Sequence, residues 1–213
     1  MGLHNFMEGY WPRFNKKDRS KIGGIGKAAA KVFYEKGYIE TSIDDIADSA
    51  KMTKGGIYYY FKSKNEILYF VLEHYVDLFL ENLEQDLKKI SDPFSKIQFI
   101  ISRHIDFYYK NLPEGKVLLH EVHCLFPEYF KVIARKEKKY LNIVARVLAD
   151  YFGRNIPKDQ LKVITFCLFG MCNWIYSWYN PKGPVLPQKL AKIIYSIFSV
   201  GVRELNEFKK TMT

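Results

Sequence analysis

The sequence predicts an all-α protein in which a small N-terminal domain of three helices precedes a larger helical domain. Three observations support this fold class. Apolar residues recur three and four positions apart along almost the whole chain, which is the spacing of one helix face. No stretch alternates apolar and polar residues for long enough to indicate a strand. Capping residues and prolines divide the pattern into pieces of helical length.

The first helix is predicted over residues 18–36. Ile22, Ile25, Ala29 and Phe33 fall on one of its faces, and Gly37 is a natural residue to follow a helix C-terminus. Glycines at positions 23, 24 and 26 weaken the first turns unless close packing compensates. They do not form a phosphate-binding loop, because the G-x-x-x-x-G-K-[ST] pattern and a preceding strand are both missing.

Two short helices follow, each opened by a residue that caps helices well. Ser42 precedes a helix that runs to Ala50, and Thr53 precedes a second helix over residues 54–61. Only residues 51–52 separate the two helices. Two short helices joined by a tight turn, with a third helix before them, form a helix-turn-helix arrangement.

The remaining helices are long and are bounded by caps or prolines. Ser63 and Glu66 form a capping box that predicts a helix reaching about Ile90. Further helices are expected over residues 93–112, 114–126, 127–152, 157–179 and 187–210.

Composition and charge narrow the possible classes of protein. Of the 213 residues, 48% are hydrophobic and 16% aromatic, which is enough for a sizeable core and too much for a mainly disordered chain. Lysine and arginine number 33 against 23 acidic residues, so the net charge is +10 and nucleic acid is a candidate partner. Cys124, Cys167 and Cys172 lie in apolar stretches, which predicts buried thiols and a cytoplasmic location.

Secretion and membrane insertion are not expected. The N-terminus lacks the basic stretch and apolar run of a signal peptide. Residues 163–181 carry no charged side chain over a length close to a membrane span. They include Thr165, Asn173 and Ser177, which favours a helix buried in an oligomer.

The helix-turn-helix region resembles the TetR family of transcriptional regulators. The resemblance covers residues 19–70 and rests on Phe33, Gly37-Tyr38, Thr41-Ser42-Ile43, Ile46-Ala47, Thr53–Phe61 and Lys64–Leu68. It implies a tail over residues 1–18, a DNA-binding domain over 19–64 and a ligand-binding and dimerisation domain over 65–213. It also implies a ligand-responsive repressor that binds a palindromic operator as a dimer and needs no cofactor. Motifs such as G-x-S-x-G and H-E-x-x-H are absent, so an enzyme is not expected.

The second short helix is the candidate recognition helix, because such helices meet base edges with their N-terminal residues. Ile57 and Phe61 are predicted to face the interior, which leaves Tyr58 and Tyr59 outward for phosphate or thymine-methyl contacts. The alternative is that the tyrosines only pack against the first helix. By resemblance the DNA surface comprises Ser42, Thr53, Lys54, Gly55, Tyr58, Tyr59 and Lys64. Asp44 departs from the family pattern, and it either caps its helix or repels the DNA backbone.

Charge is concentrated near the helix-turn-helix. Residues 1–64 hold 12 basic and 7 acidic residues, and residues 65–213 hold 21 and 16, so each part carries +5. The charge density is therefore more than twice as high in the first part, which fits DNA binding. Five basic residues of the tail form either an arm that reaches DNA or an idle extension: Arg13, Lys16, Lys17, Arg19 and Lys21.

In the family architecture the last two helices pair with those of a second copy in a four-helix bundle. The uncharged helix over 163–179 and an apolar stripe from Leu190 to Phe198 suit this arrangement. An effector pocket is expected among the preceding helices, with core packing as the alternative for each candidate. The candidates are Phe99, Arg103, Phe107, His120, His123, Phe126, Phe169, Asn173 and Trp174.

The segment over residues 178–187 resembles the end of TetR members that regulate fatty-acid or steroid breakdown and respond to acyl-CoA thioesters. By this resemblance the effector is an acyl-CoA, with its phosphates near basic residues such as Arg103, Arg135 or Lys139. An aromatic drug is an alternative effector. A metal ion bound by His120 and His123, with Glu121, Cys124 or His104, is another, although no second motif of fixed spacing supports it.

Overall fold

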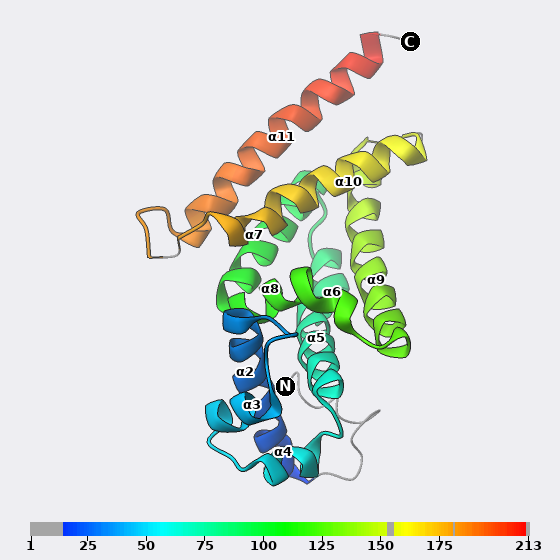
Figure 1. Cartoon of the computed structure of the whole chain (residues 1–213). Coiled ribbons are helices and arrows are strands. Elements are labelled where there is room, and N and C mark those ends of the chain that lie inside the picture. The colour runs from blue at the N-terminus through cyan, green and yellow to red at the C-terminus, as the bar shows by residue number, and fades with distance from the viewer. Residues whose placement is uncertain (1–14, 153–155, 181, 212–213) are drawn as a thin grey trace. The chain divides into compact units, whose positions relative to one another are not determined.

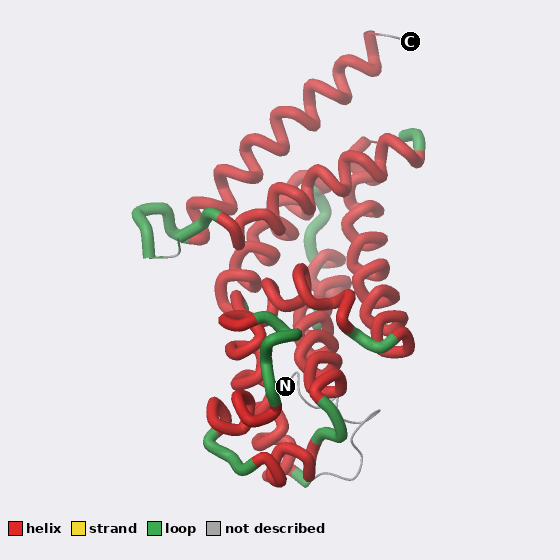
Figure 2. The backbone as a smooth tube through the Cα atoms, in the orientation of Figure 1, coloured by secondary structure: helices red, strands yellow, loops and turns green. Residues whose placement is uncertain are grey.

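The computed structural model describes residues 15–152, 156–180 and 182–211, and every regular element in those ranges is a helix (Figure 1, Figure 2). In chain order the elements are α2 (Lys16–Lys36), α3 (Ile43–Ala50), α4 (Lys54–Tyr60), α5 (Lys64–Leu80), α6 (Leu83–Lys88), α7 (Pro93–Lys110), α8 (Leu112–Glu121), the 3-10 helix η1 (Val122–Cys124), α9 (Pro127–Phe152), α10 (Lys158–Asn173), the 3-10 helix η2 (Trp174–Ser177) and α11 (Pro187–Thr211). The predicted all-α class is confirmed.

Helix α2 begins two residues earlier than expected because Asn15 caps it. The Asn15 side chain accepts hydrogen bonds from the backbone N–H groups of Lys17 and Asp18, and the Asp18 carboxylate accepts one from the Asn15 N–H. Four of the five basic residues predicted for an arm therefore belong to α2, and Arg13 lies outside the described residues. The helix ends at Gly37, whose φ of 85° is a value that glycine adopts without strain.

The two short helices begin at the predicted caps. Ser42 accepts a hydrogen bond from the backbone N–H of Asp45 at 3.1 Å, and Thr53 accepts one from the N–H of Gly56 at 3.1 Å. Lys51 makes the turn between them with a left-handed backbone, at φ 54°. Helix α4 ends at Tyr60, so Phe61 follows the helix in an extended conformation.

The prediction of one helix from residue 64 to Ile90 is wrong. Helix α5 ends at Leu80, and α6 starts at Leu83 after Asn82, which has φ 57°. Leu83 and Leu87 are nevertheless buried, so the apolar spacing continues past the break. Periodicity alone could not reveal the interruption, because it is a backbone event at Glu81 and Asn82.

Two other predicted helices end earlier than expected. The helix predicted over 114–126 is α8 followed by η1, and the helix predicted over 157–179 is α10 followed by η2. Short 3-10 turns often finish an α-helix, because they satisfy carbonyl groups that have no partner further along. The tighter turn changes the direction of the side chains that it carries.

Packing divides the chain into two compact units whose limits differ from the predicted boundary at residues 64 and 65. Unit 1 comprises the chain up to Glu81 together with Asn111–Glu137. Unit 2 comprises Asn82–Lys110 together with the chain from Lys138 onward. The domain boundaries predicted from the sequence therefore remain a proposal, and the two units defined by packing do not coincide with them.

Each unit is held by its own helix contacts. In unit 1, α2 packs against α3, α5 and α8. Val117, Leu125 and Ile133 join the same buried cluster as Ile46 and Ile57 of the helix-turn-helix. In unit 2, α7 packs along α11, and α10 contacts both.

Gly26 of α2 allows a close approach of α5. A Cβ atom at this position would lie 2.5 Å from Cε1 of the buried Phe70 ring. At Gly24, two residues earlier, an added Cβ would meet nothing within 4 Å. The packing that was expected to compensate for a helical glycine is therefore present at Gly26 and absent at Gly24.

We predict that Gly26→Ala destabilises the protein by about 1–3 kcal/mol, because Phe70 must move out of a packed position. The matched variant Gly24→Ala should be neutral or stabilising by up to about 1 kcal/mol, because it only improves helix propensity. Urea unfolding followed by circular dichroism measures both. Equal effects of the two substitutions would contradict the close contact.

Candidate nucleic-acid interface and interior polar cluster

Helix α4 divides its aromatic residues between the interior and the surface. Ile57 and Phe61 are buried, as predicted. Tyr58 is 49% exposed and Tyr59 is 66% exposed, so both point outward. Tyr60 is buried, and its hydroxyl donates to Oδ1 of Asp18 at 3.1 Å. Packing against the first helix therefore applies to Tyr60 and leaves Tyr58 and Tyr59 available for contact.

The N-terminal turn of α4 is exposed. Thr53, Lys54 and Gly55 are all on the surface, and an added Cβ at Gly55 would meet nothing within 4 Å. A nucleic acid could therefore approach the backbone closely at this turn. The positive end of the α4 dipole also favours a phosphate here, although the Thr53 side chain already binds the N–H of Gly56.

Asp44 forms an ion pair that was not among the two alternatives considered for it. Its Oδ2 lies 2.8 Å from Nζ of Lys54, so the carboxylate pairs with the first residue of the candidate recognition helix. The Asp44 carboxylate, through this hydrogen bond, raises the pKa of the Lys54 ammonium. Both side chains are exposed. Asp44 thus competes with a phosphate for Lys54.

Ser42 and Asp45 form a second local network at the start of α3. The exposed Ser42 hydroxyl donates to Asp45 Oδ2 at 2.7 Å. Lys36 donates to the other carboxylate oxygen of Asp45, and this bond, followed by the bonds from Ser42, lowers the pKa of the Asp45 carboxyl. Ser42 therefore lies on the surface, but its hydroxyl hydrogen already forms a hydrogen bond with Asp45.

Lys64 points into the protein. Its Nζ donates to the carbonyl oxygens of Tyr38 at 2.7 Å, Ile39 at 3.1 Å and Thr41 at 2.6 Å. An ammonium group has three N–H donors, and these carbonyls use all of them. The side chain therefore holds the loop over residues 37–42, and a phosphate contact would have to replace one of these bonds.

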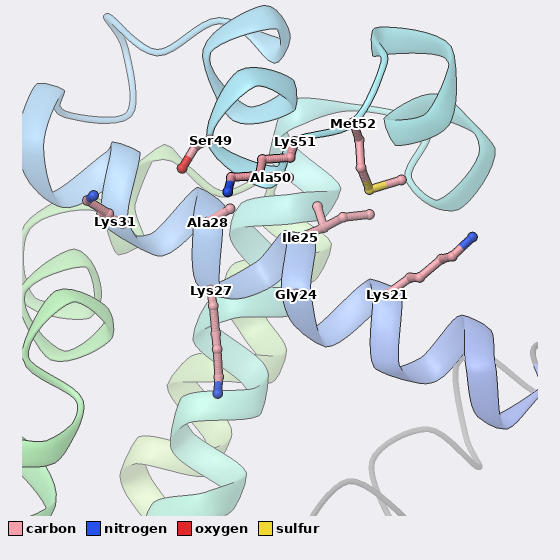
Figure 3. Close-up of a pocket in the computed structure, with 10 residues that line it drawn as sticks. All are labelled: Lys21, Gly24, Ile25, Lys27, Ala28, Lys31, Ser49, Ala50, Lys51 and Met52. Atoms are coloured by element: carbon pink, nitrogen blue, oxygen red, sulfur yellow. The ribbon is translucent and has the colours of Figure 1, made fainter.

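A basic hollow of about 760 Å³ lies between α2 and the turn that joins α3 to α4 (Figure 3). Its lining contains four lysines and no carboxylate: Lys21, Lys27, Lys31 and Lys51, with Gly24, Ile25, Ala28, Ser49, Ala50 and Met52. Figure 3 shows Lys27 pointing away from Ser49, so the lysines spread over the rim. The hollow places these lysines beside Met52, next to the Thr53 cap.

The nine predicted effector residues are divided between the two units. His120, His123 and Phe126 belong to unit 1 and are exposed, so their assignment to an interior pocket is wrong. His120 ends α8, and His123 and Phe126 lie in η1 and the segment after it. Trp174 is 61% exposed because it lies in η2, beyond the regular turns of α10.

Phe99, Arg103 and Phe107 are half-buried on α7, and Phe169 and Asn173 are half-buried on α10. Of these, Phe169 and Asn173 meet around a residue that was considered only as a metal ligand, His104. Nε2 of His104 lies 2.9 Å from Oδ1 of Asn173, and Nδ1 lies 3.2 Å from the Tyr140 hydroxyl.

The His104 cluster is polar at its centre and aromatic around it. The Phe169 ring contacts both His104 and Tyr140 edge to face, at centroid distances of 6.1 Å and 5.2 Å. Burial lowers the pKa of His104 to about 4, against an upward influence of the Asn173 hydrogen bond. The imidazole is therefore neutral at pH 7, with Nε2–H donating to Asn173 and Nδ1 accepting from Tyr140.

Two of the three basic residues proposed for an anionic effector lie near carboxylates. Arg103 lies 3.9 Å from Asp86, and Lys139 lies 3.9 Å from Glu84. Arg135 belongs to unit 1 and is exposed. Arg103 and Lys139 lie near carboxylates that are not part of the His104 cluster, and nothing in the sequence distinguished Tyr140 as the fourth member of that cluster.

Across the described ranges, no three His, Cys, Asp or Glu side chains gather closely enough to hold a metal ion. Cys124 has His123 and Glu121 near its sulfur, at 3.5 Å and 3.7 Å, while His104 lies in unit 2. None of the helices within the described residues is both long enough and apolar enough to span a membrane.

Family models match both parts of the chain. Residues 25–69 match the model described as bacterial regulatory proteins, tetR family. Residues 91–202 match the model described as the tetracyclin repressor-like, C-terminal domain. The second match alone covers more than half of the chain.

Individual proteins support the same grouping. The fatty acid metabolism regulator protein of Bacillus subtilis (strain 168) is 30% identical over 148 residues, which cover 70% of this chain and 76% of that protein. A TetR-family transcriptional regulator from Bordetella parapertussis 12822 aligns with a TM-score of 0.80 at 30% identity, covering 83% of this chain and 93% of that one. AibR, solved in complex with isovaleryl coenzyme A and operator DNA, aligns with a TM-score of 0.74 at 27% identity, covering 83% and 97%.

The burial of His104 predicts that stability falls on acidification. Its pKa is about 4 in the folded protein and 6.5 ordinarily, so between these values the unfolded chain binds a proton that the folded protein does not. The stability from neutral His104 is present above pH 6.5 and is lost as pH falls toward 4. Between pH 7 and pH 5 the loss is on the order of 2 kcal/mol.

The measurement is the free energy of unfolding at pH 7 and pH 5 for the natural protein and for His104→Gln, which cannot titrate. We expect the variant to lose less stability between the two pH values. An identical loss in both proteins would show that His104 is not held neutral by the fold.

Proposed function

The chain belongs to the TetR family of bacterial transcriptional regulators, and we propose from this premise that it is a repressor that binds operator DNA through α3 and α4 and releases it when a small effector binds. It is a regulator rather than an enzyme, as are the members of the family that it resembles. The observation that carries the DNA contact is the exposed surface formed by the first turn of α4 with Tyr58 and Tyr59.

The chemistry of that surface suits double-stranded DNA. Lys54 supplies a cation for a phosphate, and the tyrosine hydroxyls can donate to phosphate oxygens while their rings meet thymine methyl groups. Thr53 and Gly55 bring the helix N-terminus to the surface, where recognition helices read base edges. Ser42 adds a contact at the start of α3, and Lys64 acts by holding the 37–42 loop.

A dimer formed by the last two helices is supported by their exposed apolar residues. Val163 and Phe166 of α10, and Ile193, Ile197 and Val200 of α11, are each more than two-fifths exposed. Exposed apolar residues on two helices that contact each other favour an interface over contact with water. A twofold dimer would place two copies of α4 about 34–36 Å apart, which matches successive major grooves of a palindrome.

The effector is proposed to be an acyl-CoA. Two relatives support this class by their names, since one regulates fatty acid metabolism and AibR was solved with isovaleryl coenzyme A. In the His104 cluster, Asn173 accepts from the imidazole through Oδ1, and its Nδ2 amide could donate to a thioester carbonyl beside the Phe169 and Tyr140 rings. The effector would release DNA by favouring a dimer whose recognition helices are wrongly spaced.

The DNA surface is tested by Tyr59→Ala and Asp44→Asn. The first removes an exposed contact, so operator affinity should fall about tenfold or more, with no change in melting temperature. The second releases Lys54 from its carboxylate partner, so affinity should rise and the dependence of log K on log salt should steepen by up to about 0.9. Fluorescence anisotropy with an operator selected from random duplexes measures both.

Tyr109→Ala, an exposed tyrosine of α7, is the control for the first substitution and should leave affinity unchanged. If Tyr59→Ala and Asp44→Asn both bind DNA like the natural protein, another face of unit 1 contacts the operator.

The effector class is tested by titrating isovaleryl-, octanoyl- and palmitoyl-CoA calorimetrically, with free coenzyme A as the control. We expect micromolar binding of at least one thioester, with release of the operator over the same concentrations. Phe169→Ala should weaken binding, while Tyr109→Ala should not. The absence of heat for every thioester, with DNA affinity untouched, would rule out acyl-CoA and leave an aromatic drug or a metal ion as the effector to test.

A further inference from the structure

The first turn of α5 carries two neighbouring polar side chains that point inward. Lys64 is half-buried, and Asn65 is 4% exposed. A buried amide without partners would cost about 1–3 kcal/mol, so its hydrogen bonds report what it holds together. For these two residues, the partners belong to segments far away in the sequence.

Lys64 and Asn65 both hold Tyr38. Lys64 donates to the Tyr38 carbonyl and places its ammonium 4.4 Å from the centre of the Tyr38 ring. Asn65 Nδ2 donates to the Tyr38 hydroxyl at 3.2 Å. Tyr38 begins the loop over residues 37–42, which leads directly into the Ser42 cap of α3. The position of α3 therefore depends on the contacts that Lys64 and Asn65 make with Tyr38.

The other contacts of Asn65 reach the junction between η1 and α9, residues 124–126. Nδ2 donates to the carbonyl oxygen of Cys124 at 2.7 Å, and Oδ1 accepts from the backbone N–H of Phe126 at 2.9 Å. The Asn65 amide thus binds a carbonyl oxygen at the start of the junction and an N–H group at its end. Both of its N–H groups and its carbonyl oxygen are used.

The junction belongs to the C-terminal family domain by sequence and to unit 1 by packing. Residues 124–126 fall within the stretch 91–202 that matches the C-terminal domain. Leu125 is nevertheless buried in the same cluster as Ile46 of α3 and Ile57 of α4. After the junction, the chain passes from unit 1 into unit 2 within α9. The junction therefore joins the part of the chain that matches the C-terminal family domain to the core that supports α3 and α4.

We propose that Asn65 is a positioning residue that couples the 124–126 junction to the helix-turn-helix through Tyr38. This inference rests on the proposed function, because operator binding is its readout. With the junction in place, the Asn65 amide fixes Tyr38 and the 37–42 loop, and α3 and α4 keep the arrangement that binds DNA. A shift of the junction removes the bonds to Cys124 and Phe126, turns the amide and loosens the loop.

The test is a double-mutant cycle on the full-length protein, read by operator affinity. Asn65→Leu keeps nearly the volume of the side chain but removes its hydrogen bonds, and Leu125→Ala disturbs the junction without touching Asn65. We expect each to weaken operator binding by about tenfold, in keeping with the loss of two or three buried hydrogen bonds or of a core side chain. The double variant should bind no more weakly than either single variant, because the coupling is already broken.

Ile133→Ala is the matched control. Ile133 is buried in the same cluster, but it takes no part in the hydrogen bonds of the Asn65 amide. Its effect should multiply with that of Asn65→Leu. Affinity for a scrambled duplex, which depends on charge rather than on helix placement, should stay unchanged in the Asn65 variant. A destabilised protein would lose both affinities together.

Three results would overturn the proposal: unchanged operator affinity in Asn65→Leu, effects of Asn65→Leu and Leu125→Ala that multiply, or an equal loss on the scrambled duplex. If Asn65→Leu fails to fold, Tyr38→Phe replaces it, because it removes only the hydroxyl that Asn65 binds, and the same cycle is measured. Tyr59→Ala is run in parallel. If it too leaves operator binding unchanged, the proposed DNA surface is at fault rather than the coupling.

Discussion

The candidate recognition helix is only seven residues long, and a helix of this length does not persist in water by itself. Its position therefore depends on the burial of Ile57 and Tyr60 and on the Thr53 cap. The burial supplies the energy that the helix lacks, and the cap satisfies a backbone N–H at its exposed end. The side chains that α4 exposes follow from this attachment, since the residues between the buried positions must point outward.

The support for that short helix is drawn from distant parts of the chain. The buried cluster of unit 1 includes Val117, Leu125 and Ile133, which lie beyond the long α5 and α7 in sequence. A DNA-binding unit made only of residues 19–64 would leave this core incomplete. The same packing brings a segment of the C-terminal family domain against the helix-turn-helix.

Unit 2 has a polar cluster in its interior and apolar residues on its surface. Its interior holds a neutral histidine among aromatic rings, and hydrogen bonds to Asn173 and Tyr140 satisfy both ring nitrogens. The outer faces of α10 and α11 expose aliphatic and aromatic residues such as Phe166 and Ile197. A buried polar group without partners and an apolar face in water are both costly, which is why the first is fully bonded and the second favours association.

The sequence by itself determined the helical class, the caps at Ser42 and Thr53, the end of α2 at Gly37 and the outward direction of Tyr58 and Tyr59. These features depend on a few neighbouring residues and on the helical period, which are local properties. Only the tertiary structure decided the partner of Asp44, the inward path of Lys64, the break at Asn82, the exposure of Trp174 and the meeting of His104 with Tyr140. Apart from the break at Asn82 and the 3-10 turn that carries Trp174, which are backbone events, each of these depends on which segment packs against the residue. Helical spacing contains no information about that choice.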